Sequence, residues 1–295
     1  MLKTIIVAVG LALVAASAQA QAPTSAPRPA QKPPLTGTLK KINDTGIITL
    51  GFREASVPFS SKNAEGKPGG YSVDLCLNVV EQLKYDMKRP IEVRWLPVTI
   101  ANRFQMVTSG RIDMECGSST NTLARRKLVD FSLLTFVDGA TLLYRTDRGL
   151  SESSNFAGRR IAVVPGSTSE KAIQTGFAKV TPKPVIVAVK DHDEGRDKLA
   201  SGEVDAYCSD RTILIGLGLQ MPNPREFAIL EQFLSYEPYG LVLRRGDPDF
   251  RLEVDRALAR LYRSGEVGEI YRYWFGANPP TGLLRAMYML ASIPE

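Results

Sequence analysis

Two stretches of this sequence decide its predicted fold, Ser109-Gly-Arg-Ile-Asp-Met-Glu-Cys116 and Ser201-Gly-Glu-Val-Asp-Ala-Tyr-Cys208. In both, a helical stretch ends at Ser-Gly, where glycine tolerates the left-handed conformation of a helix C-cap, and a short strand follows. The two copies predict two similar α/β lobes, with a ligand between them at the carboxyl ends of the strands. A chance match is the alternative, since Ser-Gly before an alternating strand is a common connection.

The segments before the first copy predict alternating strands and helices. A strand is expected at 46–52, a helix over 73–83 capped by Ser72, a strand at 91–96 and a helix over 101–109. This order implies right-handed βαβ crossovers and a mostly parallel sheet.

A second series predicts the second lobe. A strand is expected at 161–164, a helix from Thr168, a strand at 185–189 and a helix from Arg196, before the second copy of the repeat. We therefore predict that residues 145–239 form the second lobe, inserted into the first.

Two strands are expected to connect the lobes, one at 141–144 and one at 240–243. The first lobe then comprises 37–144 and 240–295. The predicted fold class is α/β, a clamshell of two lobes joined by a two-strand hinge that lets them close on a ligand.

The N-terminal residues predict export. Lys3 precedes an apolar run and Ser17-Ala-Gln-Ala20, so residues 1–20 are expected to be a cleaved signal peptide. The proline-rich stretch 21–36 is expected to be a flexible lead-in. No later stretch approaches the roughly 20 apolar residues that cross a bilayer.

Charge and cysteine content exclude several classes of protein. The net charge is +6, but the basic residues are scattered and the longest basic run is 125–127, so we expect no nucleic-acid partner. With one histidine and no Cys-x-x-Cys, we expect no metal site and no cofactor. The three cysteines leave at least one unpaired. A bridge between Cys116 and Cys208 is not expected, because it would clamp the lobes, and the pairing stays open.

Polar residues after the strands predict anion binding. In the first lobe, Gly117-Ser-Ser-Thr120 precedes Thr122 and Arg125, whose planar guanidinium matches a carboxylate. A capped helix with a solvated basic face is an equal alternative for this stretch alone. In the second lobe, Pro165-Gly-Ser-Thr-Ser-Glu170 opens a helix and offers backbone N–H groups to an anion.

Together these residues predict a site for an α-amino acid. Arg125 and the helix start near Thr168 would hold the α-carboxylate, and Asp210 would hold the α-ammonium.

Longer blocks of sequence resemble a known family. The blocks are Phe52-Arg-Glu-Ala-Ser-Val-Pro-Phe-Ser60, Glu115-Cys-Gly-Ser-Ser-Thr-Asn121, Gly166-Ser-Thr-Ser-Glu170, Lys190-Asp-His192, Tyr239-Gly240 and Trp274-Phe275. In order and at similar spacing, from about residue 37 to 280, they resemble the glutamate/aspartate-binding branch of the periplasmic amino-acid-binding proteins (family 3) of bacterial ABC transporters.

The resemblance implies roles for particular residues. Ser118, Thr120 and Arg125 match residues that hold the α-carboxylate, helped by the position of Thr168, and Asp210 matches the residue that holds the ammonium. The positions of Arg53, Arg103 and His192 match residues around the side-chain carboxylate of the ligand, and Ser169 is included in the candidate site. The implied ligand is L-glutamate or L-aspartate, and the implied partner is the membrane permease of an ABC transporter. We expect a monomeric periplasmic protein.

Without this resemblance, the sequence would suggest that His192 is a solvated loop residue with no role in the site. Because Asp191 and Asp193 flank it, we expect it to stay protonated and to pair with an anionic side chain. One departure concerns Ile100, which stands where the resembling branch has a serine. The choice between acidic and amide ligands therefore stays open.

Two other functions remain as alternatives to a binding protein that does no chemistry. An exported dehydratase-like enzyme on the same scaffold would need a positioned acid or base, such as Glu115 or Glu170. Against it, the sequence has no nucleophile elbow and no phosphate-binding P-loop. A ligand-sensing module for a membrane receptor would use the same lobes.

Overall fold

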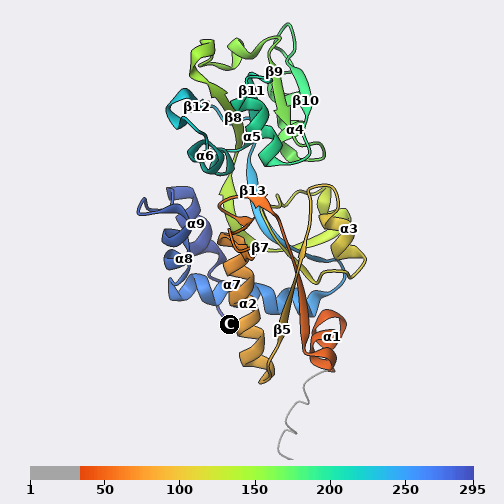
Figure 1. Ribbon diagram of the computed structural model, residues 1–295. Helices are drawn as coiled ribbons and strands as arrows, with labels where there is room; N and C mark the ends of the chain where they lie inside the picture. The colour runs from red at the N-terminus through yellow and green to blue at the C-terminus, as the bar shows by residue number, and fades with distance from the viewer. Residues whose placement is uncertain (1–33) are drawn as a thin grey trace, which may run out of the picture. The chain divides into compact units, whose positions relative to one another are not determined.

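A computed structural model describes residues 34–295. The predicted signal peptide, 1–20, and most of the predicted lead-in, 21–36, lie outside the described residues. Within the described range the chain forms two five-stranded sheets, each with its own helices, and a small three-stranded sheet (Figure 1). The three strands of the small sheet are β2 (Ala55–Ser56), β3 (Ser60–Lys62) and β4 (Pro68–Gly69).

The first sheet has the strand order β5-β1-β6-β13-β7. The strands β1, β5 and β6 are parallel, while β13 runs antiparallel to both β6 and β7. Its strands are β1 (Ile47–Phe52), β5 (Glu92–Pro97), β6 (Met114–Cys116), β7 (Val129–Asp138) and β13 (Glu237–Arg244). The helices of this lobe are α1 (Gly37–Thr45), α2 (Tyr71–Met87), α3 (Arg103–Thr108), α7 (Pro248–Ser264), α8 (Val267–Phe275) and α9 (Gly282–Ala291).

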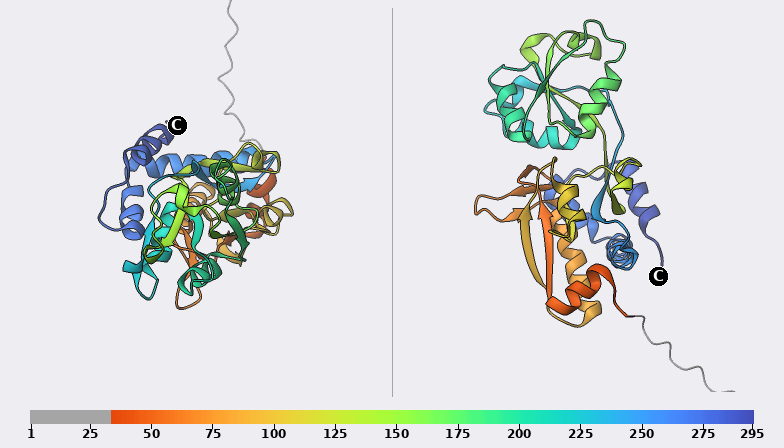
Figure 2. Two further views of the ribbon diagram at one scale, coloured as in Figure 1. Left: turned by 90° about the horizontal axis from the view of Figure 1, so that it is seen from above. Right: turned by 90° about the vertical axis from the view of Figure 1, so that its right-hand side faces the viewer.

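The second sheet has the order β10-β9-β11-β8-β12 and forms the core of the other lobe (Figure 2). Its strands are β8 (Ala140–Arg145), β9 (Arg160–Val163), β10 (Val185–Ala188), β11 (Ala206–Asp210) and β12 (Phe227–Ile229). The helices α4 (Thr168–Gly176), α5 (His192–Ala200) and α6 (Arg211–Leu219) pack on it. The prediction of parallel strands alternating with helices is confirmed for β9, β10 and β11.

The duplicated pattern has the same structure in both lobes. Gly110 and Gly202 have left-handed φ angles of 74° and 76°, as predicted for residues that follow a helix. The aspartate of each copy then binds the backbone of the neighbouring strand. Asp113 accepts a hydrogen bond from the backbone N–H of Thr49 (2.7 Å). In the same way, Asp205 accepts one from the backbone N–H of Arg160 (2.8 Å). Each copy therefore fixes its strand beside a parallel neighbour, β6 beside β1 in the first lobe and β11 beside β9 in the second.

Some predicted boundaries are wrong. The strand at 141–144 was expected in the first lobe, but β8 pairs with β11 and β12 and belongs to the second sheet. The helix expected from Ala101 begins at Arg103, because the side chain of Asn102 bonds to the backbone of Thr99. The helix expected from Arg196 begins at His192, because Asp191 caps it by accepting the N–H of Glu194.

The structure also pairs the cysteines. Cys76 on α2 forms a disulfide with Cys116 on β6, and Cys208 is the free, buried thiol. The bond ties α2 to the strand that leads into the polar stretch 117–121. It leaves the two lobes free of a covalent link between Cys116 and Cys208.

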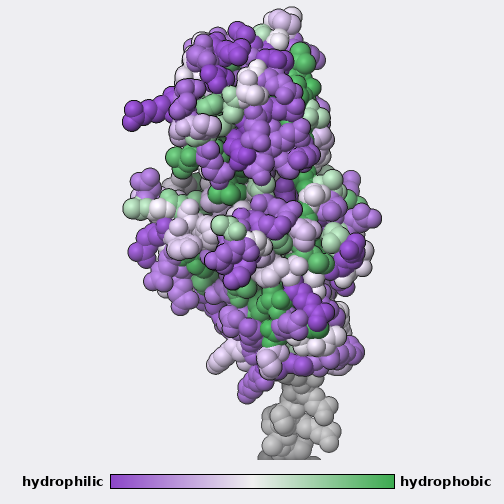
Figure 3. Space-filling model, viewed as in Figure 1, coloured by the Kyte–Doolittle hydropathy of each residue, from purple (hydrophilic) through white to green (hydrophobic). Residues whose placement is uncertain are grey.

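No helix among residues 34–295 is both long and apolar enough to cross a membrane. The face shown in Figure 3 is mainly hydrophilic, with small, separate hydrophobic patches.

Candidate functional site

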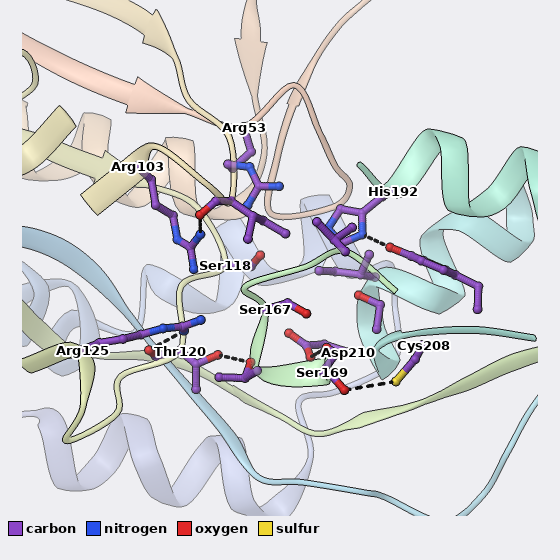
Figure 4. Close-up of a pocket in the computed structure, with 16 residues that line it drawn as sticks. Arg53, Arg103, Ser118, Thr120, Arg125, Ser167, Ser169, His192, Cys208 and Asp210 are labelled. Carbon is purple, nitrogen blue, oxygen red and sulfur yellow. Dashed lines mark hydrogen bonds between the residues drawn. The ribbon is translucent and has the colours of Figure 1, made fainter. Parts of the chain in front are cut away.

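One pocket brings together all nine residues that the sequence predicted as a site (Figure 4). Side chains from both lobes form its wall. The nine predicted residues in it are Arg53, Arg103, Ser118, Thr120, Arg125, Thr168, Ser169, His192 and Asp210.

The topology explains why these residues meet. Arg53 directly follows β1, and Ser118 and Thr120 follow β6. In the second lobe, Thr168 starts the helix after β9 and Asp210 ends β11. The carboxyl ends of parallel strands lie at one edge of a sheet, so each lobe presents its polar residues at one edge.

Thr120, Arg125, Thr168, Ser169 and Asp210 form what we call the Asp210 end of the pocket. The guanidinium of Arg125 donates to the backbone oxygen of Thr120 (2.9 Å). The hydroxyls of Thr120 and Thr168 lie 3.2 Å apart and join the two lobes. This end therefore combines a guanidinium, two hydroxyls and the N-terminus of α4, all of which favour an anion.

The carboxyl of Asp210 lies beside these anion-binding groups. The hydroxyl of Ser169 donates to its Oδ1 (3.3 Å), and the hydroxyl of Tyr239 donates to its Oδ2. Burial, together with the negative charges of Glu237 and Asp138, raises the pKa of Asp210 well above its usual value. A cation beside this carboxyl would stabilise its ionised form.

Arg53, Arg103 and His192 form what we call the His192 end. The guanidinium of Arg103 donates from Nε to the hydroxyl of Ser119 (2.9 Å) and from Nη1 to the backbone oxygen of Ile100. Burial and the nearby charge of Arg125 lower the pKa of Arg103 to about 9, so it is a cation at neutral pH. Arg53 is 6% exposed.

The expected protonation of His192 is wrong. The imidazole is 4% exposed, and burial and the charge of Arg53 lower its pKa to about 3. Its Nδ1 lies 2.6 Å from the hydroxyl of Tyr207. A tyrosine hydroxyl that donates to Nδ1 leaves the proton of the neutral ring on Nε2. In that tautomer His192 is a neutral donor to a ligand.

A buried carboxyl lies behind the arginines. Glu115 on β6 is fully buried and does not line the pocket. Burial raises its pKa, while the charges of Arg103 and Arg53 oppose that rise. Glu170, the other carboxyl considered as an acid or base, accepts the backbone N–H of Gly166 (2.9 Å) and also lies outside the pocket wall.

The sequence prediction missed several pocket residues. Tyr207, Cys208 and Ser209 belong to β11, and a strand of this pattern suggests only core packing. The sequence offered no signal for them beyond their position before Asp210. The remaining residues of the wall are Ile100, Val164, Ser167 and Ile213. Among the described residues, no group of three or more His, Cys, Asp or Glu side chains is placed to hold a metal ion.

Known proteins share this fold and much of this sequence. The L-glutamate/L-aspartate-binding protein of Pseudomonas aeruginosa is 40% identical over 84% of this chain and 83% of its own length. The glutamate/aspartate import solute-binding protein of Escherichia coli is 33% identical over 92% of this chain and 89% of its own. An ancestral arginine-binding protein, solved with glutamine bound, is 27% identical with a TM-score of 0.70, over 79% of this chain and 99% of its own.

The family model for bacterial extracellular solute-binding proteins, family 3, matches residues 48–277. That match includes both five-stranded sheets apart from Ile47, and all the residues of the pocket wall. With the fold and the relatives, it shows that the chain belongs to the family of bacterial extracellular solute-binding proteins, family 3.

Proposed function

We propose that this protein captures an acidic L-amino acid, glutamate or aspartate, between its lobes and delivers it to the permease of an ABC importer. The observation behind the proposal is the charge of the pocket wall. It contains three arginines, Arg53, Arg103 and Arg125, and one carboxyl, Asp210. An acidic amino acid has two carboxylates and one ammonium, which this set complements. An amide ligand would leave the positive charge of Arg53 and Arg103 only partly balanced.

Each end of the pocket binds a different part of the ligand. At the Asp210 end, Arg125, Thr120 and Thr168 bind the α-carboxylate, to which Ser118 of the pocket wall also donates, and Asp210 binds the ammonium. At the His192 end, Arg53 and Arg103 bind the side-chain carboxylate, and Nε2–H of His192 donates to it. The relatives named for glutamate and aspartate support the identity of the ligand.

The protein acts in the periplasm as a monomer, after removal of the signal peptide, and it does no chemistry on its ligand. Glu115 and Glu170, the two carboxyls considered above as an acid or base, lie outside the pocket wall, and Asp210, the carboxyl in the wall, is assigned to the ammonium of the ligand. A residue that cannot reach the ligand cannot transfer a proton to it.

A thermal unfolding screen against the common amino acids tests the proposal. The mature chain from residue 21, refolded after removal of bound ligand, should gain about 2.7 kcal/mol at 100 times the dissociation constant. For a protein of this size that gain raises the melting temperature by roughly 5–10 °C. Glutamate and aspartate should give this rise and their amides a smaller one. A rise with basic or apolar amino acids instead would refute the proposal.

Two variants test the orientation of the ligand. Arg53→Ala and His192→Ala should each weaken the binding of acidic amino acids more than that of their amides, because both side chains lie at the His192 end. Equal losses for acid and amide would place the side chain of the ligand elsewhere in the pocket.

A further inference from the structure

Glu115 has an unusual place behind the pocket. It is the middle residue of β6, opposite Gly51 of β1 and Val242 of β13. Its side chain is fully buried, neither carboxylate oxygen has a hydrogen-bond partner within 3.5 Å among the described residues, and the nearby hydroxyl of Ser119 lowers its pKa less than Arg103 and Arg53 do. Burial of a poorly hydrogen-bonded carboxylate is unfavourable, so positive charge nearby is what favours its ionised form.

That charge comes from the arginines of the His192 end. Arg103 and Arg53 are the cations with the strongest effect on Glu115, ahead of Arg125. The backbone at Gly117 lies against the same carboxylate. A Cβ added there would overlap Oε1 of Glu115 and lie 3.1 Å from Cγ of Arg53. The absence of a side chain at this position lets the carboxylate lie close to the aliphatic part of Arg53.

We propose that Glu115 is a specificity-determining residue that limits the net charge of the His192 end, so that the pocket prefers a singly charged side chain. The charges that interact most strongly there are Arg53 (+1), Arg103 (+1) and Glu115 (−1), a sum of +1 beside neutral His192; Asp191 acts on Arg53 less strongly than Glu115 does. This sum matches one carboxylate. Without Glu115 the sum is +2, which matches a doubly charged group. The inference rests on the proposed function.

The test compares three ligands that share the α-amino acid group. L-glutamine has a neutral side chain, L-glutamate a single negative charge, and O-phospho-L-serine about two at pH 7.5. Calorimetric titration gives the dissociation constants for the wild-type protein and for Glu115→Gln, which keeps the shape and removes the charge.

Glu115→Gln should change the preference in a fixed direction. The ratio of phosphoserine affinity to glutamate affinity should rise about tenfold or more. The ratio of glutamine affinity to glutamate affinity should fall. Both changes are expected because the variant pocket has one more positive charge, which attracts each negative charge of the ligand side chain. Glu115→Asp keeps the charge and should keep both ratios near those of the wild-type protein. A purely structural role would change all affinities together and leave the ratios unchanged.

Glu237→Gln is the matched control. Glu237 is also a buried carboxyl, 1% exposed, but it accepts the hydroxyl of Thr120 (2.6 Å) and acts on Arg125. Its effect falls on the α-carboxylate that all three ligands share, so the ratios should stay as in the wild-type protein.

The outcomes separate this inference from the proposed function. If wild-type protein binds glutamate but Glu115→Gln keeps the wild-type ratios, the inference is wrong and the proposed function stands. If wild-type protein binds neither glutamate nor aspartate, the proposed function fails. Should Glu115→Gln not unfold cooperatively, Gly117→Ala is the second variant. Its Cβ displaces the carboxylate from Arg53 and should raise the phosphoserine ratio, and an unchanged ratio would refute the inference.

Discussion

Arg125 and Arg126 are adjacent, yet only the first lies in the pocket. Arg125 donates to the backbone of Thr120 and lies over the ring of Phe104, 5.3 Å from its centroid. Arg126 is exposed and donates to the side chain of Asn121 (2.9 Å). The pair therefore offers a natural comparison between a binding residue and a surface residue of the same type.

Arg125→Ala should abolish or severely weaken the binding of every amino acid, acid or amide. It removes the guanidinium that binds the shared α-carboxylate, and loss of one partner of a buried charged pair costs about 2–5 kcal/mol, or roughly 30-fold and upwards in affinity. Calorimetric titration with glutamate and glutamine checks this. Arg126→Ala should bind like the wild-type protein, and near-normal binding by Arg125→Ala would show that the α-carboxylate lies elsewhere.

Single residues also show where sequence reasoning fails. The charged neighbours of His192 suggested a protonated imidazole, but the fold buries the ring and places it near Arg53, and both effects favour the neutral form. Sequence neighbours say little about the charges that surround a buried group, because those charges come from other elements.

At the scale of elements, the disulfide between α2 and β6 fixes the strand that leads into the pocket. Cys76 and Cys116 are separated by 40 residues. Closing a loop of this length restricts the unfolded chain and stabilises the folded state by about 4 kcal/mol in the chain-entropy model.

Replacing both cysteines, in a Cys76→Ala/Cys116→Ala variant, should therefore lower the free energy of unfolding by about 4 kcal/mol. Urea unfolding followed by circular dichroism measures it. Reductant should destabilise the wild-type protein to a similar extent and leave the double variant unchanged. Equal stability of the oxidised and reduced wild-type protein would contradict the prediction.

The contact between α7 and β7 contains a carboxyl with a raised pKa. Asp255 of α7 accepts the backbone N–H of Leu133 (2.6 Å). Burial raises its pKa to about 6, although this hydrogen bond and the charge of Arg251 oppose the rise. The folded state thus holds the proton more tightly than the unfolded chain. The contribution of Asp255 to stability is greatest below pH 4 and is lost as the pH rises through 6.

Asp255→Asn keeps the acceptor and cannot ionise. At pH 8 the variant should be more stable than the wild-type protein by about 1–2 kcal/mol, a value reduced for the partial exposure of the carboxyl. At pH 4 the difference should vanish. Urea unfolding at the two pH values measures both. A wild-type protein that is the more stable of the two at pH 8 would refute the raised pKa.

At the scale of the whole molecule, the duplicated pattern predicted two α/β lobes because it depends only on local backbone structure, which neighbouring residues determine. Glycine at a helix end and an aspartate before a strand have the same backbone roles at 109–116 and 201–208. The pocket residues that follow strands were predictable for the same reason, as Thr168 and Asp210 show. Arg53, Arg103 and His192 entered the prediction through a family resemblance.

The remaining features depend on contacts between distant elements. The packing of β6 determines that Cys116 pairs with Cys76 and that Glu115 is buried beside Arg53. No local sequence pattern predicts this packing. The assignment of β8 to the second sheet depends on its hydrogen bonds with β11, 60 or more residues away in the chain. Sequence periodicity identifies a strand, but it does not say which sheet the strand joins.

The most direct test of the central claim is calorimetric titration of the ligand-free mature protein with L-glutamate, L-aspartate, L-glutamine and L-asparagine. The charges of the pocket predict tight binding of the two acids and much weaker binding of the two amides. Preference for the amides, or no binding of any of the four, would contradict the claim that this pocket binds an acidic amino acid.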